Sequence, residues 1–281
     1  MTLIAIVLVV LVVAAGLYYN QRWWRPRQAV ARLPDDGLKV GELTAPLATL
    51  TVLLLVFVLV QTYGSWAAAG RAETDEATAT LLLFREVDLI RDARLRTELR
   101  KEVVCYATSV IRQDWPAMGN RRISSVPTYW GARIREHGVR LVRAPGGSTA
   151  GEQIVKRDGE RASARQSRLG EARPTVPKAL SWLILVAVVM VLAVLSTASM
   201  PGVGRLVQVA IVLAAAVAFV STLLLILDLD HPYAGPLRRD PTQTEFVRNQ
   251  IAAEVRGPLP CDPTGLPVDA PGFRSTTSPL G

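Results

Sequence analysis

Apolar residues gather in four long stretches that contain no charged residue. These stretches cover residues 2–21, 43–70, 179–204 and 206–227. A helix that crosses a bilayer needs roughly 20 consecutive, predominantly apolar residues. The pattern therefore predicts four membrane-spanning helices, and it excludes a simple soluble enzyme, a secreted disulfide scaffold and a disordered chain.

The spacing of these stretches divides the chain into segments. We predict an all-α protein with four spans and an α-helical polar insert between spans 2 and 3. The C-terminal segment is rich in Pro, Gly, Ser and Thr, which is typical of disorder. The predicted segments are span 1 over 1–21, a short basic loop over 22–42, span 2 over 43–70, the polar insert over 71–177, span 3 with a hairpin turn over 178–204, span 4 over 205–230, a post-membrane turn and short helix over 231–257, and a disordered tail over 258–281.

The insert is predicted to begin with helix. Ala77, Phe84 and Val87 recur at the three- and four-residue spacing of one helix face, and a second apolar stripe starts at Leu95. The two stripes do not join smoothly, which leaves open a helical hairpin that turns at 91–93 or a single long helix. Further helices are expected on both sides of the Gly-rich stretch near 146–147.

The chain is basic, with a formal net charge of +8. The insert carries 20 Lys and Arg against 14 Asp and Glu, so most of this excess lies there. Basic segments of membrane proteins are attracted to anionic lipid, and we find no nucleic-acid-binding motif. The predicted partner is the lipid bilayer and not nucleic acid. The two cysteines, Cys105 and Cys261, permit one disulfide but do not argue for it.

Motifs for catalysis are absent from the sequence. It has two histidines, His137 and His231, and neither a nucleophile elbow, a phosphate-binding glycine loop nor a paired metal motif. We therefore predict no enzyme, no catalytic residue, no cofactor and no metal site.

The end of the fourth span holds one group of candidate residues. Two carboxylates at the end of a span are costly unless they are hydrated or paired, so an ion-coordinating or gating turn is one interpretation. The alternative is an interfacial helix stop, in which Asp230 caps the turn. The candidates are Asp228, Asp230, Pro232, Tyr233 and Gly235.

Two further groups lie on the second span and just after it. If the second span faced a pore, its polar residues would form a wet face and its apolar ones a constriction. The alternative is that the polar residues mark the interface and that Thr51 bonds its own backbone. Glu73 and Glu76 begin the insert, either as a ring of negative charge in an oligomer or as favourable anions at a helix N-terminus. The pore-lining candidates are Thr51, Leu55, Leu59, Gln61, Thr62 and Ser65.

Small residues recur every four positions in the fourth span, at Ala210, Ala214, Ala218 and Thr222. This spacing lets two helices approach closely in lipid. It indicates either packing within the chain or contact between subunits.

Several motifs taken together resemble the bestrophin-like membrane proteins of bacteria, the DUF4239 group. They are Glu73 to Ala77, the stretch from Leu95 through Tyr106 to Met118, the stretch from Arg165 to Trp182, and Leu229 to Gly235. The resemblance covers residues 1–254 and leaves out the tail. The sequence departs from the group at Asp114, where Glu is usual, and at Tyr233, where Phe is usual.

The resemblance implies a fold and a function. Bestrophins are pentameric anion channels with four spans, a helical cytosolic domain and a pore lined by the second span. By this route the chain would be an oligomeric, passive anion channel of a bacterial cell membrane, with the insert and both termini in the cytosol. Thr51 to Ser65 would line the pore, and Asp230, Pro232, Tyr233 and Gly235 would form the turn after the fourth span.

A different class of function stays open beside the channel. The alternative is a membrane-anchored interaction or assembly protein without transport activity, whose insert binds a partner and whose spans only anchor it. The two readings differ in oligomeric state, because four spans with so few internal polar groups cannot enclose an aqueous path alone.

Overall fold

The structure is a computed structural model that describes residues 2–20, 22, 40–144, 149–197, 205–270 and 273–280. The chain forms two compact units. The first, which we call the span unit, consists of Met1–Gly64 and Thr175–Asp230. The second, which we call the lobe, consists of Ser65–Pro174 and His231–Gly281. Most of the predicted 22–42 loop and the turn after the third span lie outside the described residues.

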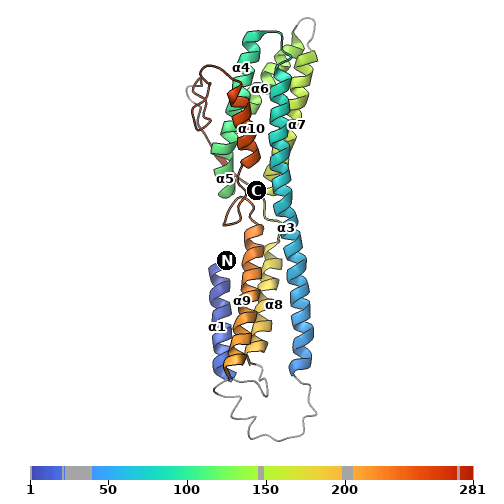
Figure 1. The fold of residues 1–281 in the computed structure, drawn as a ribbon, viewed down its shortest axis with the longest axis vertical. Helices are drawn as coiled ribbons and strands as arrows, with labels where there is room; N and C mark the ends of the chain where they lie inside the picture. Colours follow the sequence, from blue (N-terminus) through green and yellow to red (C-terminus); the bar gives the residue numbers. More distant parts are fainter. Residues whose placement is uncertain are drawn as a thin grey trace. The chain divides into compact units, whose positions relative to one another are not determined.

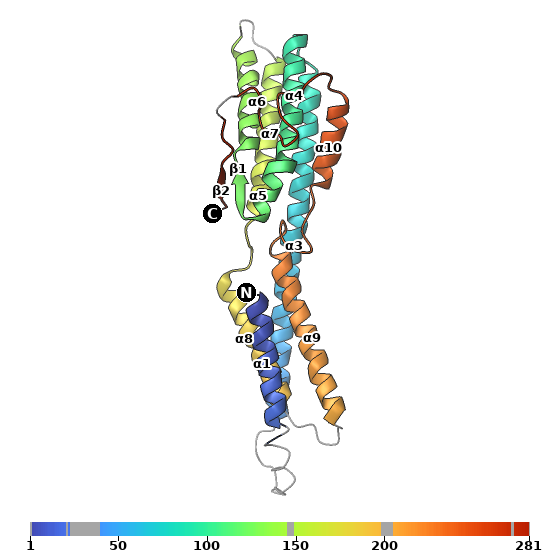
Figure 2. The ribbon, with the colours of Figure 1, turned by 90° about the vertical axis from the view of Figure 1, so that its left-hand side faces the viewer.

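The span unit consists of α1 (Thr2–Tyr19), the first part of α3 (Val40–Val87), α8 (Lys178–Thr197) and α9 (Arg205–Leu229), which lie side by side in Figures 1 and 2. Three helical stretches are long and apolar enough to cross a membrane, namely Ala45–Val87, Lys178–Thr197 and Leu206–Leu229. The described apolar part of α1, Ile6–Tyr19, is shorter. Four spans therefore stay a prediction, although four apolar helices are present.

The core of the span unit is made of aliphatic side chains from all four helices. Gly16 lets α1 approach α8, because a Cβ there would lie 1.9 Å from Ser196 Oγ. In lipid the hydrophobic effect does not drive helices together, so close packing such as that at Gly16 stabilises the bundle. The buried residues include Val9, Val13, Leu55, Val58, Ile184, Val188, Leu192, Val212 and Ile226.

Helix α3 is longer than the predicted second span, and it contributes to both units. The sequence analysis expected span 2 to end at residue 70, but the helix runs unbroken from Val40 to Val87. Gly64 and Gly70 do not interrupt it, because a helix tolerates an isolated glycine at a cost of about 1 kcal/mol. The boundary between the units falls within this helix, at residues 64–65.

The lobe opens with a helical hairpin. Helix α3 ends at Val87 and α4 (Ala93–Ser109) begins after Asp92, whose side chain accepts hydrogen bonds from the N–H groups of Arg94 and Leu95. Of the two alternatives left open, the hairpin is therefore the one found. The cap explains it, because Asp92 satisfies two N–H groups that lack partners within the helix.

The rest of the lobe is mostly helical (Figures 1 and 2). Helix α4 continues into a π-helix, η2 (Val110–Asp114), and then into α5 (Trp115–Gly119). The remaining helices are α6 (Val126–Arg143), α7 (Thr149–Glu171) and α10 (Thr242–Ala253). The described chain departs from an all-α fold at one short antiparallel pair, β1 (Arg122–Ser124) with β2 (Thr277–Pro279), in which Ile123 is opposite Ser278.

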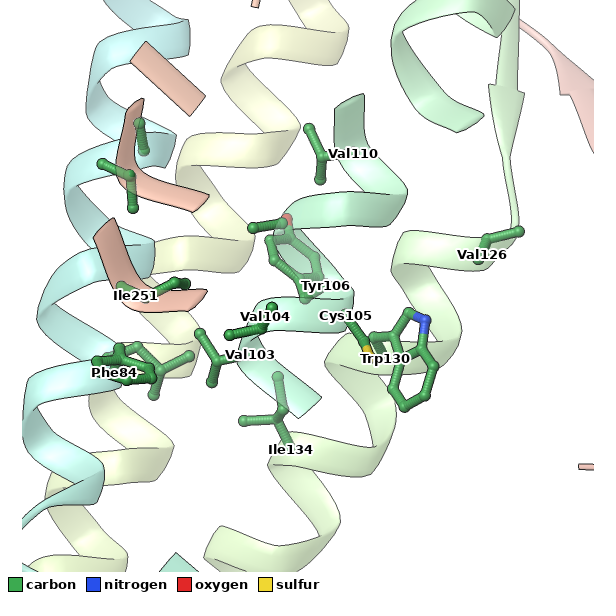
Figure 3. Close-up of a cluster of buried hydrophobic side chains, with 14 of the residues drawn as sticks. Phe84, Val103, Val104, Cys105, Tyr106, Val110, Val126, Trp130, Ile134 and Ile251 are labelled. Atoms are coloured by element: carbon green, nitrogen blue, oxygen red, sulfur yellow. The ribbon is translucent and has the colours of Figure 1, made fainter. Parts of the chain in front are cut away.

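The core of the lobe is a separate apolar cluster, shown in Figure 3. Phe84 from α3, Val103 from α4, Ile134 from α6 and Ile251 from α10 are all fully buried there. Trp130, the largest fully buried side chain, lies on α6. The lobe thus has a hydrophobic core of its own, distinct from that of the span unit.

The C-terminal tail does not fit the predicted disorder. Residues 254–280, which we call the strap, pack along the lobe wherever they are described. Gly265 accepts a hydrogen bond from Trp130 Nε1 at 2.8 Å, and Phe273 contacts the ring of Tyr129 with centroids 4.7 Å apart. A disulfide joins Cys261 to Cys105 of α4. The composition, rich in Pro, Gly, Ser and Thr, suggested disorder, but these long-range contacts order the described part of the strap.

Asp262 organises a turn in the strap. Its Oδ1 accepts hydrogen bonds from the Thr264 N–H at 2.8 Å, the Leu266 N–H at 2.9 Å and the Thr264 hydroxyl at 2.7 Å. Burial opposes ionisation of the carboxyl, but these hydrogen bonds outweigh it and hold the pKa of Asp262 below its ordinary value. The ionised carboxylate is therefore the form that supports the turn.

Acid is expected to loosen this turn. Because the pKa is lower in the folded state, the stabilisation is present above about pH 4 and is lost as the pH falls through the folded value. We expect hydrogen exchange at the Leu266 amide, relative to its intrinsic rate, to rise a few-fold between pH 5 and pH 3. Asp262→Asn should remove this pH response, and an unchanged response in that variant would contradict the prediction.

Candidate functional site

A cluster of buried ions occupies the interior of the lobe. Arg168 of α7 is fully buried and donates through Nε to Glu76 Oε2 at 2.5 Å and through Nη2 to Asp114 Oδ2 at 2.8 Å. Arg165, one turn earlier, also lies 3.2 Å from Asp114 Oδ2. We call Glu76, Asp114, Arg165 and Arg168 the charge cluster. It joins α3, η2 and α7, which are far apart in the sequence.

Neighbouring groups donate hydrogen bonds to the remaining carboxylate oxygens of the cluster. The Tyr106 hydroxyl of α4 donates to Glu76 Oε1 at 2.5 Å, and the Ser124 N–H of β1 donates to Asp114 Oδ1 at 3.1 Å. The guanidinium of Arg168 also lies 5.0 Å from the centre of the Trp115 ring. Charges out of water need partners of this kind, because an unpaired ion in a protein interior costs several kcal/mol.

The protonation states of the cluster are fixed by its surroundings. Burial raises the pKa of Tyr106 well above its ordinary value, so the phenol keeps its proton and donates it. Burial alone would lower the pKa of Arg168, but the carboxylates of Glu76 and Asp114 outweigh it and raise that pKa. Arg168 therefore keeps its charge and Tyr106 its proton, so these two groups act as a structural clamp rather than as proton carriers.

Local backbone geometry aims Asp114 into the cluster. Residues 110–114 form a π-helix between α4 and α5, and Pro116 lies in the first turn of α5. Such a bulge widens one helical turn, and single π-turns are frequent at functional positions. Pro116 does not break the helical run, because the first turn of a helix tolerates proline, which has no N–H in need of a partner there.

One interpretation expected Glu73 and Glu76 at a helix N-terminus, but both lie in the interior of α3. Helix α3 passes through both, and both are buried, Glu73 being 5% exposed and Glu76 2% exposed. Glu73 instead accepts hydrogen bonds from the N–H groups of Gln243 at 2.9 Å and Thr244 at 3.4 Å. It thus caps α10 from another helix. Buried and bonded in this way, neither carboxylate is available for a surface ring.

Loss of the Glu73 cap is expected to loosen the start of α10. Pro241 precedes the helix and supplies no side-chain cap, so Glu73→Ala leaves the first N–H groups of α10 without that partner. A lost cap costs about 1 kcal/mol, or roughly fivefold faster local opening. Hydrogen exchange at Gln243 and Thr244 measures it. Asp75→Ala, which removes an exposed carboxylate two residues away, is the control and should change nothing.

The turn after α9 is split between the two units. Asp230 belongs to the span unit and accepts hydrogen bonds from the N–H groups of Thr175 at 2.8 Å and Val176 at 3.0 Å, just before α8. This supports the interpretation of Asp230 as a cap, though it caps the approach to α8 rather than its own turn. Asp228 is half-buried near the end of α9.

The other turn residues pack inside the lobe. The Tyr233 ring meets the Trp115 ring edge to face with centroids 5.2 Å apart, and Pro232 is buried. Gly235 has a φ of +86°, a left-handed conformation that favours glycine. Trp66 Nε1 of α3 donates to Leu237 O at 2.9 Å. Within the described residues, no group of three or more His, Cys, Asp or Glu is placed to hold a metal ion.

The pore-lining candidates on α3 are divided by the structure. Thr51 and Thr62 are fully buried in the span unit and Leu55 is 4% exposed, so these three face the other spans of the same chain. Thr51 Oγ1 donates to Leu47 O at 2.8 Å and Thr62 Oγ1 to Val58 O at 3.0 Å. This placement does not support these three as pore-lining residues. Leu59 and Ser65 are half-buried and Gln61 is exposed.

The exposed face of α3 is apolar and lies opposite the two threonines. Leu53, Phe57 and Val60 follow one another at helical spacing and are 63–65% exposed in the single chain. These three residues were not among the predicted pore-lining candidates, whose apolar members were Leu55 and Leu59. Their signal was present in the spacing, which places 53, 57, 60 and 64 together on one side of the helix.

The sequence analysis did not select the basic half of the charge cluster or Asp114 as site residues. Arg168 and Asp114 lie 54 positions apart in sequence, so no local motif joins them. A weak signal existed in the sequence, because Arg168 precedes the buried Leu169 and Asp114 precedes the buried Trp115. Only the fold shows that the four residues meet.

Comparison with solved structures identifies the fold. Two crystal structures of variants of a bacterial bestrophin homologue from Klebsiella pneumoniae each match with a TM-score of 0.69 at 14% identity. Each match covers 90% of this chain, and 98% and 96% of the other. The crystal structure of a membrane protein variant matches with a TM-score of 0.68 at 15% identity, over 90% of this chain and 97% of that one. No curated protein matches the chain.

The family is shown by the sequence itself. A family model described as the Bestrophin-like domain matches residues 7–243, which is well over half of the chain. Its apolar helices and this match together mark the chain as a membrane protein. The protein belongs to the Bestrophin-like family.

Proposed function

We propose that the chain is one subunit of an oligomeric, passive anion channel in the cell membrane, with a pore that lies between copies and is lined by α3. The likeness to bestrophins supports the class of function, and the fold supports the four-helix arrangement. The proposal places the lobe and both termini in the cytosol. No covalent chemistry is required of any residue.

The observation that carries the proposal is the dry interior of the span unit. The buried hydroxyls of Thr51, Thr62 and Ser196 each donate to a carbonyl of their own helix. The side chains around them are aliphatic. The described interior of the span unit buries few other polar side chains, among them Asn20 and Gln208, which is too little to replace the hydration shell of an ion. If the protein conducts, the path lies between copies.

Two exposed faces support assembly. The apolar face of α3 at Leu53, Phe57 and Val60 is 63–65% exposed in the described single chain. On α9, Ala210, Ala214 and Ala218 also face outward, so this small-residue stripe does not serve packing within the chain. Small residues let helices from separate copies approach closely in lipid. We assign the α9 stripe to subunit contact and the α3 face to the pore.

Anion selectivity rests on charge. The segment 71–177 carries six more basic than acidic residues, and the ion pairs that Arg168 makes lie inside the lobe. The excess of positive charge is therefore on the solvated surface, where it raises the local anion concentration. Attraction of this kind weakens as salt screens it, with a Debye length of about 10 Å at 0.1 M.

Chloride flux tests the proposal. The purified full-length protein is reconstituted into liposomes and efflux is compared with that of empty vesicles, while native mass in detergent gives the oligomeric state. We expect an oligomer and flux above the empty control. A stable monomer, or an inserted oligomer without flux, would favour the alternative of a membrane-anchored assembly protein.

A further inference from the structure

A disulfide fastens the strap to the lobe. Cys105 lies on α4 and is fully buried, and Cys261 lies in the strap and is 9% exposed. The two cysteines are 156 positions apart and are the two that the chain has. The bond thus joins the end of the chain to the middle of the lobe, and its Cys261 side is at the lobe's edge.

The other fastenings of the strap are non-covalent. Trp130 donates to Gly265 O, and Arg133 of α6 bridges Glu102 of α4 at 2.8 Å and Asp269 of the strap at 2.5 Å. Near the end of the chain, β2 pairs with three residues of β1. Asp269 is 40% exposed, and ion pairs near the surface contribute at most about one factor of five in an equilibrium. Each of these contacts can open separately.

Most of the core of the lobe comes from residues that precede the strap, and Cys261, Leu259 and Leu266 of the strap add to it. Its fully buried residues Leu83, Phe84, Leu99, Ile134 and Ile154 all come from helices that precede the strap in the chain. The charge cluster also lies entirely within 76–168. Release of the strap would uncover Trp130 and Tyr129 on α6, but it would leave the helices of the lobe packed on one another.

We propose that the Cys105–Cys261 bond is a redox-sensitive clasp that holds the strap on the lobe when oxidised and frees it when reduced. A thiolate of a dithiol reductant attacks the sulfur of Cys261, the more exposed of the two, and Cys105 leaves as a thiolate that takes up a proton. The second thiol of the reductant then displaces Cys261 and closes a disulfide in the reductant. Two electrons pass from the reductant to the clasp.

The cytosolic orientation proposed for the lobe would expose the disulfide to a reducing environment. Cytosolic thiols keep most cysteines reduced, and disulfides found there are usually transient or redox-sensing. A lobe in the cytosol would hold its strap open at rest and fasten it under oxidation. This inference concerns the strap and its bond, so it is tested without measuring ion flux, and failure of one proposal leaves the other standing.

Hydrogen exchange of the full-length protein in detergent tests the mechanical part. We expect amides of the strap to exchange at least tenfold faster after reduction with dithiothreitol, while those of α4 and α6 change less than twofold. Cys261→Ser should show the fast strap without reductant and no response to it. Ser278→Ala, an exposed position of β2, is the control and should behave like the wild type.

Two results would overturn the clasp as a device for the strap. One is a strap that stays protected after reduction, which would make the bond redundant. The other is an equal acceleration in α4 and α6, which would make it a staple of the whole lobe.

Thiol trapping in intact membranes tests the redox part. Membranes are equilibrated with glutathione buffers of increasing reduced fraction, and free cysteines are counted by a mass-tagged maleimide. We expect the bond to pass from oxidised to reduced within the range of cytosolic buffers. A bond that resists excess reduced glutathione overnight would identify a permanent disulfide and overturn the proposal.

Discussion

Replacement of Arg168 by methionine is expected to lower the unfolding midpoint of the lobe by roughly 10 °C. The substitution leaves Glu76 and Asp114 buried without their shared cation, and breaking a buried pair in this way costs about 3–5 kcal/mol. For a unit of this size, each kcal/mol corresponds to about 2–4 °C. Circular dichroism of the purified protein in detergent follows the loss of helix.

A matched substitution separates the charge cluster from a general effect of losing arginine. Arg140 lies on α6 and is 62% exposed, and it pairs only weakly with Glu136 at 3.6 Å. Arg140→Met should change the midpoint by less than about 4 °C, because exposed pairs contribute about 0–1 kcal/mol. Similar losses in both variants would contradict a special role for the cluster.

Neutralising both carboxylates together with Arg168 is expected to recover part of the loss. In Arg168→Met combined with Glu76→Gln and Asp114→Asn, no buried carboxylate is left uncompensated, and Arg165 is the one charge of the cluster that remains. Removing the fully buried ions together is often close to neutral, whereas removing one partner is not. The triple variant should therefore unfold at a higher temperature than Arg168→Met alone. If the triple variant unfolds at a lower temperature than Arg168→Met, uncompensated charge is not the cause of the lost stability. The loss would then come from buried amide groups that lack hydrogen-bond partners.

Local pattern was enough to predict the helices. The charge-free stretches that start at 179 and 206 correspond to α8 and α9, because in lipid every backbone group must find a partner within its own helix. The turn at 91–93 also left a signal in the broken apolar stripe. The full length of α3 left no such signal. The sequence changes from apolar to polar at Arg71, but the helix continues through this change to Val87.

The misplaced residues have a common physical cause. Thr51 and Thr62 look polar in a sequence, but a threonine hydroxyl in a helix can bond a carbonyl four residues earlier and become effectively apolar. The order of the strap and the meeting of Glu76 with Arg168 depend on partners 92 or more positions away. Periodicity describes neighbours along one element, so it carries no information about such pairs.

The face that α3 presents to the pore can be found by making it more polar. Val60→Ser on the exposed face is expected to raise chloride flux per oligomer on the order of tenfold, which corresponds to about 1.4 kcal/mol off the barrier. An apolar constriction limits conduction by excluding water, and a hydroxyl there lets the constriction wet. The measurement is efflux from liposomes, normalised to the amount of inserted oligomer.

The same substitution on another span provides the control. Val186 of α8 is 50% exposed in the single chain, close to the 65% of Val60, and both are valines on the outer face of an apolar helix. If α3 lines the pore and α8 faces lipid or another subunit, Val186→Ser should leave flux unchanged. Equal increases in the two variants would show that the substitution perturbs the bundle rather than the pore. An increase at Val186 alone would move the pore to α8, and the dry interior of the single span unit would still require that pore to lie between copies.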